Sequence, residues 1–279
     1  MTRSTATHHA HAAADADPHA EGEAIERQAL HSLHAVATPE IRKALGLAWT
    51  ETTGATASIA AALPASAIVV NRAFLTDRQA VADTAEVYRA AGVGRYFLHL
   101  PPDVPPRRGT IAPPGYREAR SWQKFVRRRG APIPDAPAFA IERITPGPAA
   151  AAVARIVCAA FDLGERAEVW LARLCRDPRW QVFLARVDGR PAGTGALFVS
   201  DRIGWSDWGA TAPDFRGRGV QRALLRHRLV TAEALGLDRV HTCTGAPAPG
   251  DPQHSYRNIL RCGFGETVVR RNLTLADMP

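Results

Sequence analysis

The chain has 279 residues, of which 46% are hydrophobic and 22% charged, a composition typical of a globular protein large enough for two domains. The formal net charge is +8, and lysine occurs only at Lys43 and Lys124, so arginine supplies nearly all of the positive charge. Such a charge favours anionic ligands such as phosphates or nucleic acid. The longest apolar stretch, residues 55–70, is interrupted by Pro64 and is shorter than the roughly 20 apolar residues that span a membrane. A membrane-spanning protein is therefore not expected.

Cysteine usage bears on metal binding and location. Cys158, Cys175, Cys243 and Cys262 are widely spaced and form no Cys-x-x-Cys pair. This spacing argues against a zinc site and against a disulfide framework, so no metal is expected. The N-terminal residues lack the apolar segment of a secretory signal. A reducing cytoplasm is the expected location.

The first part of the chain has a weak pattern. Residues 1–20, rich in histidine and alanine, are predicted to be a disordered tail, and residues 21–135 a first domain. Gly92 ends its second helix in the usual manner. Residues 130–137 contain three prolines and are the predicted linker. Helices are expected at residues 21–47 and 77–91, and strands at residues 67–70, 96–100 and 121–126.

The second part, residues 136–279, is more regular. Asp188-Gly189 is a strong hairpin turn signal, and Gly236 ends a long helix. Strands are expected at residues 139–144, 180–187, 193–200, 204–212, 239–244 and 267–273, and helices at residues 148–161, 165–176, 219–235 and 254–262. This alternation predicts a mixed α/β fold around one sheet.

Two pairs of segments suggest a duplicated domain. Residues 91–96 align without gaps with residues 235–240, each being a helix end, a glycine and a strand start. Residues 115–118 align with residues 263–266 at nearly the same separation along the chain. A constant separation is the signature of an internal repeat, so two tandem domains are predicted.

A glycine-rich loop between a predicted strand and a predicted helix reads Arg216-Gly217-Arg218-Gly219-Val220-Gln221. Glycine allows the backbone to approach a ligand closely. The first N–H groups of a helix have no internal partners and carry partial positive charge, so this arrangement can hold a pyrophosphate group. Arg216, Arg218 and Arg222 strengthen the positive field. No Gly-Lys-Ser/Thr follows, and the third glycine of a dinucleotide fingerprint is missing, so neither of those motifs applies.

The loop resembles the cofactor motif Arg/Gln-x-x-Gly-x-Gly/Ala of the GNAT superfamily of N-acetyltransferases, with Gln221 where glycine or alanine is usual. Asn258 followed by Gly263-Phe264 resembles the second motif of that family. The resemblance implies a GNAT fold, acetyl-CoA as the acyl donor, and direct attack of an amine on the thioester. It places Asn258 on the pantetheine arm, and it implies cofactor contacts from Ala210, Thr211, Ala212, Arg216, Gly217, Arg218, Gly219, Val220, Gln221 and Arg222.

The first domain looks like a degenerate GNAT repeat, as in tandem members of the family. The segment equivalent to the glycine loop is residues 74–80, which contain no glycine. We therefore expect the first domain not to bind the cofactor.

The amine must lose a proton before it can attack the thioester, so a general base is needed. A lysine-type amine has an ordinary pKa near 10.4, so its neutral form costs roughly 4–5 kcal/mol at pH 7. Asp207 is the predicted general base, because it lies on the strand leading to the loop and faces the same way as Thr211 by period-two counting. An exposed strand aspartate is the alternative. Ile259 occupies the position where many GNAT enzymes have a tyrosine acid, so Ser255, Tyr256 or water is expected to protonate the thiolate.

Two other functions compete with an enzyme. A GNAT-like protein could hold acyl-CoA without turning it over. The basic run at residues 124–129, which includes Phe125, could indicate a nucleic-acid-binding protein, although no nucleic-acid motif accompanies it. The acceptor could be a small-molecule or peptide amine, and both a monomer and a homodimer fit the sequence.

Overall fold

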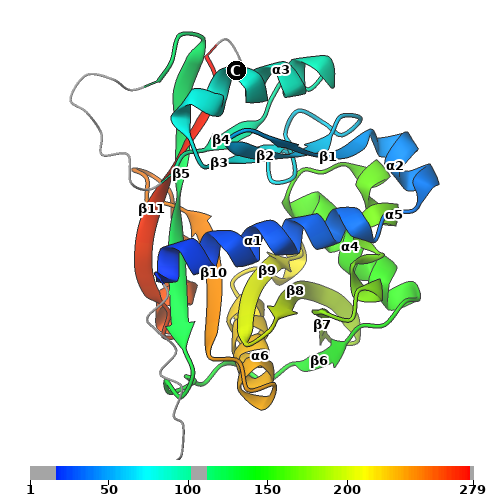
Figure 1. Cartoon of the computed structure of the whole chain (residues 1–279). Helices are drawn as coiled ribbons and strands as arrows, with labels where there is room; N and C mark the ends of the chain where they lie inside the picture. The colour runs from blue at the N-terminus through cyan, green and yellow to red at the C-terminus, as the bar shows by residue number, and fades with distance from the viewer. Residues whose placement is uncertain (1–16, 102–111, 277–279) are drawn as a thin grey trace, which may run out of the picture.

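The computed structural model describes residues 17–101 and 112–276, which form one continuous 11-stranded sheet with helices packed against it (Figure 1). Up to the linker, the elements are α1 (Pro18–Ala35), α2 (Pro39–Leu45), β1 (Leu47–Thr52), β2 (Ala55–Ala60), β3 (Arg72–Leu75), α3 (Val81–Ala90), β4 (Phe97–His99) and β5 (Tyr116–Arg128). After the linker come β6 (Ala140–Arg143), α4 (Pro148–Ala160), α5 (Glu168–Leu171), β7 (Trp180–Val187), β8 (Arg190–Ser200), β9 (Ile203–Thr211), α6 (Val220–Ala234), β10 (Arg239–Gly245), α7 (His254–Arg261) and β11 (Gly265–Leu275). The predicted mixed α/β fold is confirmed.

The strand order is β1-β2-β3-β4-β11-β5-β10-β9-β8-β7-β6, and its two halves repeat one pattern. Outward from the central pair β11–β5, β4 and β10 are antiparallel to their central neighbours, and β3 and β9 then run parallel to β4 and β10. Antiparallel strands follow on both sides. The aligned glycines also share a conformation, with φ of +71° at both Gly92 and Gly236. This repetition agrees with two tandem GNAT-like domains.

The last strand of each half lies in the sheet of the other half. β5 pairs with β10 along the whole length of β10, from Arg239 opposite Arg128 to Gly245 opposite Trp122. β11 pairs with β4 and, over most of its length, with β5. The two halves therefore share one hydrogen-bonded sheet, and the predicted boundary at residues 135 and 136 stays a prediction.

Four local predictions are corrected by the structure. The helix predicted at residues 21–47 is divided into α1 and α2, and Leu47 already begins β1. Residues 67–70 form turns and not a strand, because the amide of Val70 bonds back to the carbonyl of Ala67; the strand is β3. The helix predicted at residues 165–176 is broken into α5 and short 3₁₀ turns. The hairpin of β1 and β2 was not predicted, because its polar Thr-Thr-Gly turn has few apolar neighbours. α1 begins at Pro18, inside the predicted tail, whose first 16 residues lie outside the described part.

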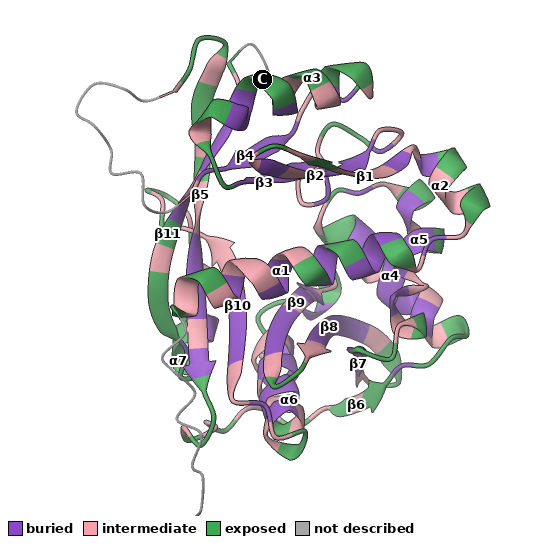
Figure 2. Cartoon of the chain, viewed as in Figure 1, coloured by how far each residue is buried: buried purple, intermediate pink, exposed green. Residues whose placement is uncertain are grey.

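The strands of the second half are covered on both faces. Along β7, Val182 and Leu184 pack into the core beneath α1 and α4, whereas Phe183 and Ala185 pack beneath α6. This is the alternation that a strand imposes on its side chains. Figure 2 shows the resulting buried residues along these strands and on the inner faces of the helices.

Helix α1 carries acidic side chains across the middle of the sheet, where it contacts β9, β10, β5 and β11 (Figure 1). Glu26 is completely buried and accepts hydrogen bonds from Arg72 on β3 at 2.5 Å, from Arg270 on β11 at 2.7 Å, and from Lys124 on β5. Burial by itself raises the pKa of a carboxyl group, but the three cations hold the pKa of Glu26 well below its ordinary value. Glu26 is therefore ionised at neutral pH.

We expect Glu26→Gln to lower the free energy of unfolding by about 3–5 kcal/mol, because breaking a buried ion pair leaves its partner charges uncompensated. Denaturant titration measures this loss. The folded pKa is lowered, so the difference from wild type should be full at neutral pH and should shrink as the pH falls through that lowered pKa. Glu86→Gln, which removes an exposed partner of Arg89, is the control and should leave the midpoint unchanged. Equal effects of the two variants would contradict a stabilising role for the cluster.

Candidate functional site

The site is built at a fork between β9 and β10. The two strands pair in parallel over only three residue pairs, which end with Trp205 opposite His241. Beyond this point β9 continues along β8, and β10 continues along β5. At the base of the fork the Thr242 hydroxyl donates to the carbonyl oxygen of Ser206 at 2.8 Å. The fork opens an otherwise continuous sheet.

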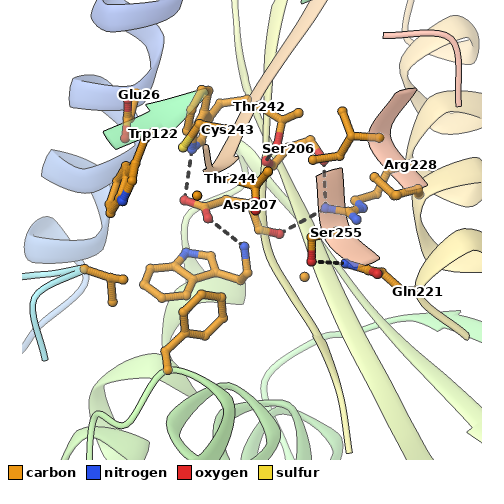
Figure 3. Close-up of a pocket in the computed structure, with 18 of the residues that line it drawn as sticks. Glu26, Trp122, Ser206, Asp207, Gln221, Arg228, Thr242, Cys243, Thr244 and Ser255 are labelled. Atoms are coloured by element: carbon orange, nitrogen blue, oxygen red, sulfur yellow. Dashed lines mark hydrogen bonds between the residues drawn. The ribbon is translucent and has the colours of Figure 1, made fainter. Parts of the chain in front are cut away.

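A cavity of about 350 Å³ lies in this fork (Figure 3). Both halves of the chain line it, which the sequence did not indicate. The second half supplies Phe161, Trp205, Ser206, Asp207, Trp208, Gly209, Gln221, Leu225, Arg228, Thr242, Cys243, Thr244, Gly245, Ser255 and Ile259. The first half supplies Glu26, Ile68, Val69, Arg72, Arg120 and Trp122.

A β-bulge shapes the β9 side of the cavity. Pairing with β8 skips from Ala210 opposite Thr194 to Asp207 opposite Ala196, so Trp208 and Gly209 face a single residue of β8. Trp208 has a φ of +49°, which is rare for a bulky residue and is often found at functional sites. The bulge corrects the period-two counting: Asp207 shares a sheet face with Ala210 and not with Thr211.

Asp207 borders the cavity and is held by two donors. Its carboxylate accepts a hydrogen bond from the Trp205 indole N–H at 2.9 Å and another from the backbone N–H of Trp208 at 2.7 Å (Figure 3). Removal from bulk water raises the pKa of Asp207, although Arg72 and the two hydrogen bonds oppose this shift. A raised pKa makes this carboxylate a better proton acceptor than an exposed aspartate.

Arg228 and Cys243 also border the cavity. Arg228 donates to the Ser206 hydroxyl at 2.7 Å and to the carbonyl oxygen of Asp207 at 3.1 Å. Burial lowers the pKa of Arg228 to about 10, so it stays charged at neutral pH. Burial raises the pKa of the Cys243 thiol to about 12, so this thiol stays protonated and is a poor nucleophile.

The glycine loop leads into α6 as the sequence predicted. Gly217 and Gly219 have φ values of +75° and +87°, a region that glycine adopts most easily. No side chain caps the first N–H groups of α6, so these donors are open to an anion. A side chain at Gly219 would lie 2.8 Å from Pro137 of the linker, whereas one at Gly217 would meet open space. α6 itself sits close to β8, because a side chain at Gly193 would lie 2.7 Å from Val220.

The equivalent helix start in the first half is closed. There the Asp77 carboxylate accepts a hydrogen bond from the backbone N–H of Gln79 at 2.9 Å. An acidic side chain thus occupies the position of an anionic ligand and would repel a phosphate. This supports the prediction that the first half does not bind the cofactor.

Gln221 joins the start of α6 to α7. Its amide nitrogen donates to the Ser255 hydroxyl at 2.9 Å, and its amide oxygen accepts from Asn258 at 2.8 Å. Ser255 lines the cavity, and its own O–H stays available to donate. The Tyr256 hydroxyl donates instead to Glu266 at 2.6 Å, and Tyr256 is not among the residues that border the cavity. Of the two predicted acids, the structure brings only Ser255 into the cavity with Asp207.

The structure places the other predicted cofactor residues around the same helix start. Ala210, Thr211 and Ala212 end β9 and lead into the loop, while Arg216 and Arg218 are exposed beside it. Within residues 17–101 and 112–276, no group of three His, Cys, Asp or Glu side chains could hold a metal ion. In the same residues no helix has the length and apolarity to cross a membrane.

Residues 152–264 match the model of the acetyltransferase (GNAT) family, while no curated protein matches the sequence. Among solved structures, the chain is similar to a GCN5-related N-acetyltransferase from Sphaerobacter thermophilus, with 18% identity over 91% of this chain and 92% of that chain and a TM-score of 0.58. A GCN5-related N-acetyltransferase from Kribbella flavida has 15% identity over 91% and 96%, with a TM-score of 0.54. A conserved protein of unknown function from Staphylococcus epidermidis has 9% identity over 88% and 100%, with a TM-score of 0.56.

At these identities the solved structures establish the fold, and their coverage extends over both halves of the chain. The family match establishes the class of the second half, which contains a domain of the acetyltransferase (GNAT) family.

We expect Gly193→Ala to lower the free energy of unfolding by about 1–3 kcal/mol, because the added methyl group overpacks the contact between β8 and α6. It would lie 2.9 Å from the backbone oxygen of Ala210, which cannot rotate away. Gly265→Ala is the matched control, since its nearest atom lies 3.8 Å away. Thermal unfolding of both variants measures the difference, and equal midpoints would show that Gly193 does not set the position of α6.

Proposed function

We propose that the protein transfers an acetyl group from acetyl-CoA to a primary amine by direct attack. One observation carries the proposal: the cavity in the fork extends from the half-buried carboxylate of Asp207 to Gln221, directly after the uncapped start of α6. The cavity thus joins Asp207, a base for the amine acceptor, to the start of α6, which can bind the phosphates of the acyl donor.

The residues at the start of α6 fit the phosphates of acetyl-CoA. Its open N–H groups and the backbone of Gly217 and Gly219 would hold the pyrophosphate, with Arg216, Arg218 and Arg222 adding positive charge. Ala210, Thr211, Ala212, Val220, Gln221 and Asn258 would line the path of the pantetheine arm. Acetyl-CoA supplies the activated thioester, and the protein supplies position and proton transfer.

Two side chains of the cavity move protons in this proposal. Asp207 takes a proton from the protonated amine, directly or through a water, and the neutral nitrogen then forms a bond to the acetyl carbon while the carbon–sulfur bond breaks. The second proton that the nitrogen loses as the amide forms passes to solvent. Ser255 donates its proton to the leaving sulfur and is reprotonated from solvent. The hydrogen bond from Gln221 fixes Ser255, and Asn258 fixes Gln221 in turn.

The alternative of a non-catalytic acyl-CoA-binding protein is less well supported, because a binder has no use for a half-buried carboxylate with a raised pKa beside the cofactor position. The nucleic-acid alternative loses its main support. Lys124 and Arg127 of the basic run are buried and pair with Glu26 and Glu233, so only Arg128 and Arg129 of the run are exposed.

We place the reaction in the cytoplasm, with a small-molecule or peptide amine as the acceptor. All four cysteines are free, and free thiols persist in a reducing compartment. The cavity volume lies in the range that holds one small ligand or the end of a longer one. A monomer and a homodimer both agree with a site built from a single chain.

The anion cradle is tested by Gly217→Asp against Gly217→Asn. The two side chains have the same shape, both tolerate positive φ, and the site has room for them. The aspartate places a negative charge at the pyrophosphate position, so we expect it to weaken acetyl-CoA binding at least about tenfold relative to the asparagine variant. Calorimetric titration measures both affinities. Equal affinities would place the cofactor elsewhere.

The base is tested by Asp207→Asn, which we expect to lower kcat by about 10²–10⁴-fold while leaving CoA affinity unchanged. The wild-type rate should rise with pH through the raised pKa of Asp207, and the variant should lack this rise. Its deficit should shrink at high pH, where the amine deprotonates unaided. Asp238→Asn, an exposed aspartate paired with Arg202, is the control. A variant with wild-type kcat at pH 7 would exclude Asp207 as the base.

A further inference from the structure

The ion cluster around Glu26, which borders the cavity through Glu26 and Arg72, has an excess of buried positive charge. Around Glu26, the two carboxylates of Glu23 and Glu26 face the three cations of Arg72, Lys124 and Arg270. The side chains of Arg72, Lys124 and Arg270 are 6%, 3% and 1% exposed. Among the described residues of this group, the cations therefore outnumber the carboxylates by one.

The other charged groups that border the cavity do not supply the missing anion. Asp207 interacts with both Arg72 and Arg228. Adding Asp207 and Arg228 to the group adds one charge of each sign, so the excess of one cation remains. Arg120, at the cavity edge, forms an ion pair with Asp251. An uncompensated buried charge is strongly unfavourable, so an anion from outside the protein would be stabilised in this cavity.

Two buried donors of the cavity also have no partner in the described part of the chain. They are Nε of Arg72 and the indole Nε1 of Trp208, and these two residues are 5% and 4% exposed. Buried donors of this kind normally have an acceptor. Both residues line the cavity, so a ligand there is the missing acceptor.

We propose that the amine acceptor also carries a carboxylate, as a free amino acid does. The carboxylate lies against Arg72 and Trp208, its amine reaches Asp207, and its side chain packs against Ile68, Val69 and Phe161 of the same cavity. The carboxylate thereby supplies the missing negative charge and accepts from both free donors. This inference rests on the proposed acetyl transfer and names its substrate class.

A carboxylate in the cavity could also belong to the acyl chain of the donor. The acceptor is the better assignment, because Arg72 comes from β3 in the first half, whereas the cofactor cradle is at α6 in the second half (Figure 1). The free donors therefore belong to the wall supplied jointly by the first half and the bulge. The experiment below separates the two sources.

The test compares L-leucine and L-phenylalanine with their amides, which keep the amine and the side chain but lack the negative charge. With acetyl-CoA we expect kcat/KM to favour each amino acid over its amide by about tenfold to a hundredfold, the worth of hydrogen bonds to a charged group. Arg72→Gln should abolish this preference. It leaves Glu23 and Glu26 facing Lys124 and Arg270, two charges of each sign, so the variant should fold.

Trp208→Phe keeps the ring and removes the N–H, so it should reduce the preference severalfold without changing the fold. Trp49→Phe is the control, because Trp49 packs against His31 and His34 and does not border the cavity. This variant should prefer the amino acids over their amides as strongly as the wild type does. The inference would be overturned if kcat/KM were the same for the amides as for the amino acids and if Arg72→Gln changed both values equally. An Arg72-dependent gain with succinyl-CoA and amides would assign the carboxylate to the acyl chain and would also overturn it.

A binding measurement separates two outcomes, the absence of a carboxylate site and the absence of acetyl transfer. Calorimetry of L-leucine and L-leucinamide with CoA-saturated protein needs no turnover. If no amine is acetylated, acetyl transfer is wrong, but Arg72-dependent binding of leucine over its amide still supports a carboxylate site. Equal binding of the two, or binding of neither, would overturn it.

Discussion

The ion cluster around Glu26 is the interaction on which the rest of the structure depends. A single buried carboxylate on α1 joins β3, β5 and β11 through Arg72, Lys124 and Arg270. These strands come from both halves of the chain, and Glu26 and Arg72 border the cavity in the fork. The cluster therefore holds the helix, the junction of the halves and one wall of the cavity in a single arrangement. Loss of the Glu26 charge, which contacts all three cations, is therefore expected to affect the junction of the halves as well as the stability of the fold.

The first half keeps the strand pattern of the second, but the Asp77 carboxylate occupies the start of its helix. Its α1, β3 and β5 line the cavity of the second half with Glu26, Arg72 and Trp122. The first half therefore shapes the site whether or not it binds a cofactor of its own. Its place beside the fork suits the recognition role proposed for Arg72.

The sequence predicted those features whose cause is local. The glycine loop, the start of α6 and the strands with clear apolar patterns depend on neighbouring residues, and they were found nearly in place. The bulge at Trp208, the exchange of β5 with β11, and the contribution of Glu26 and Arg72 to the cavity depend on contacts between distant segments. A buried glutamate on an amphipathic helix has the same local pattern as an exposed one, so its role became visible only with its three partners.

The exchange of end strands has a consequence for the order in which the chain can fold. β11 (Gly265–Leu275) lies between β4 and β5, so the sheet of the first half stays open until these residues have been synthesised. Contacts between such distant segments slow folding, and unpaired strand edges are sites of aggregation. β4 and β5 must therefore wait, with exposed edges, while more than half of the chain is made. The protein is therefore prone to aggregation through these strand edges during its synthesis, although both edges are paired in the folded structure.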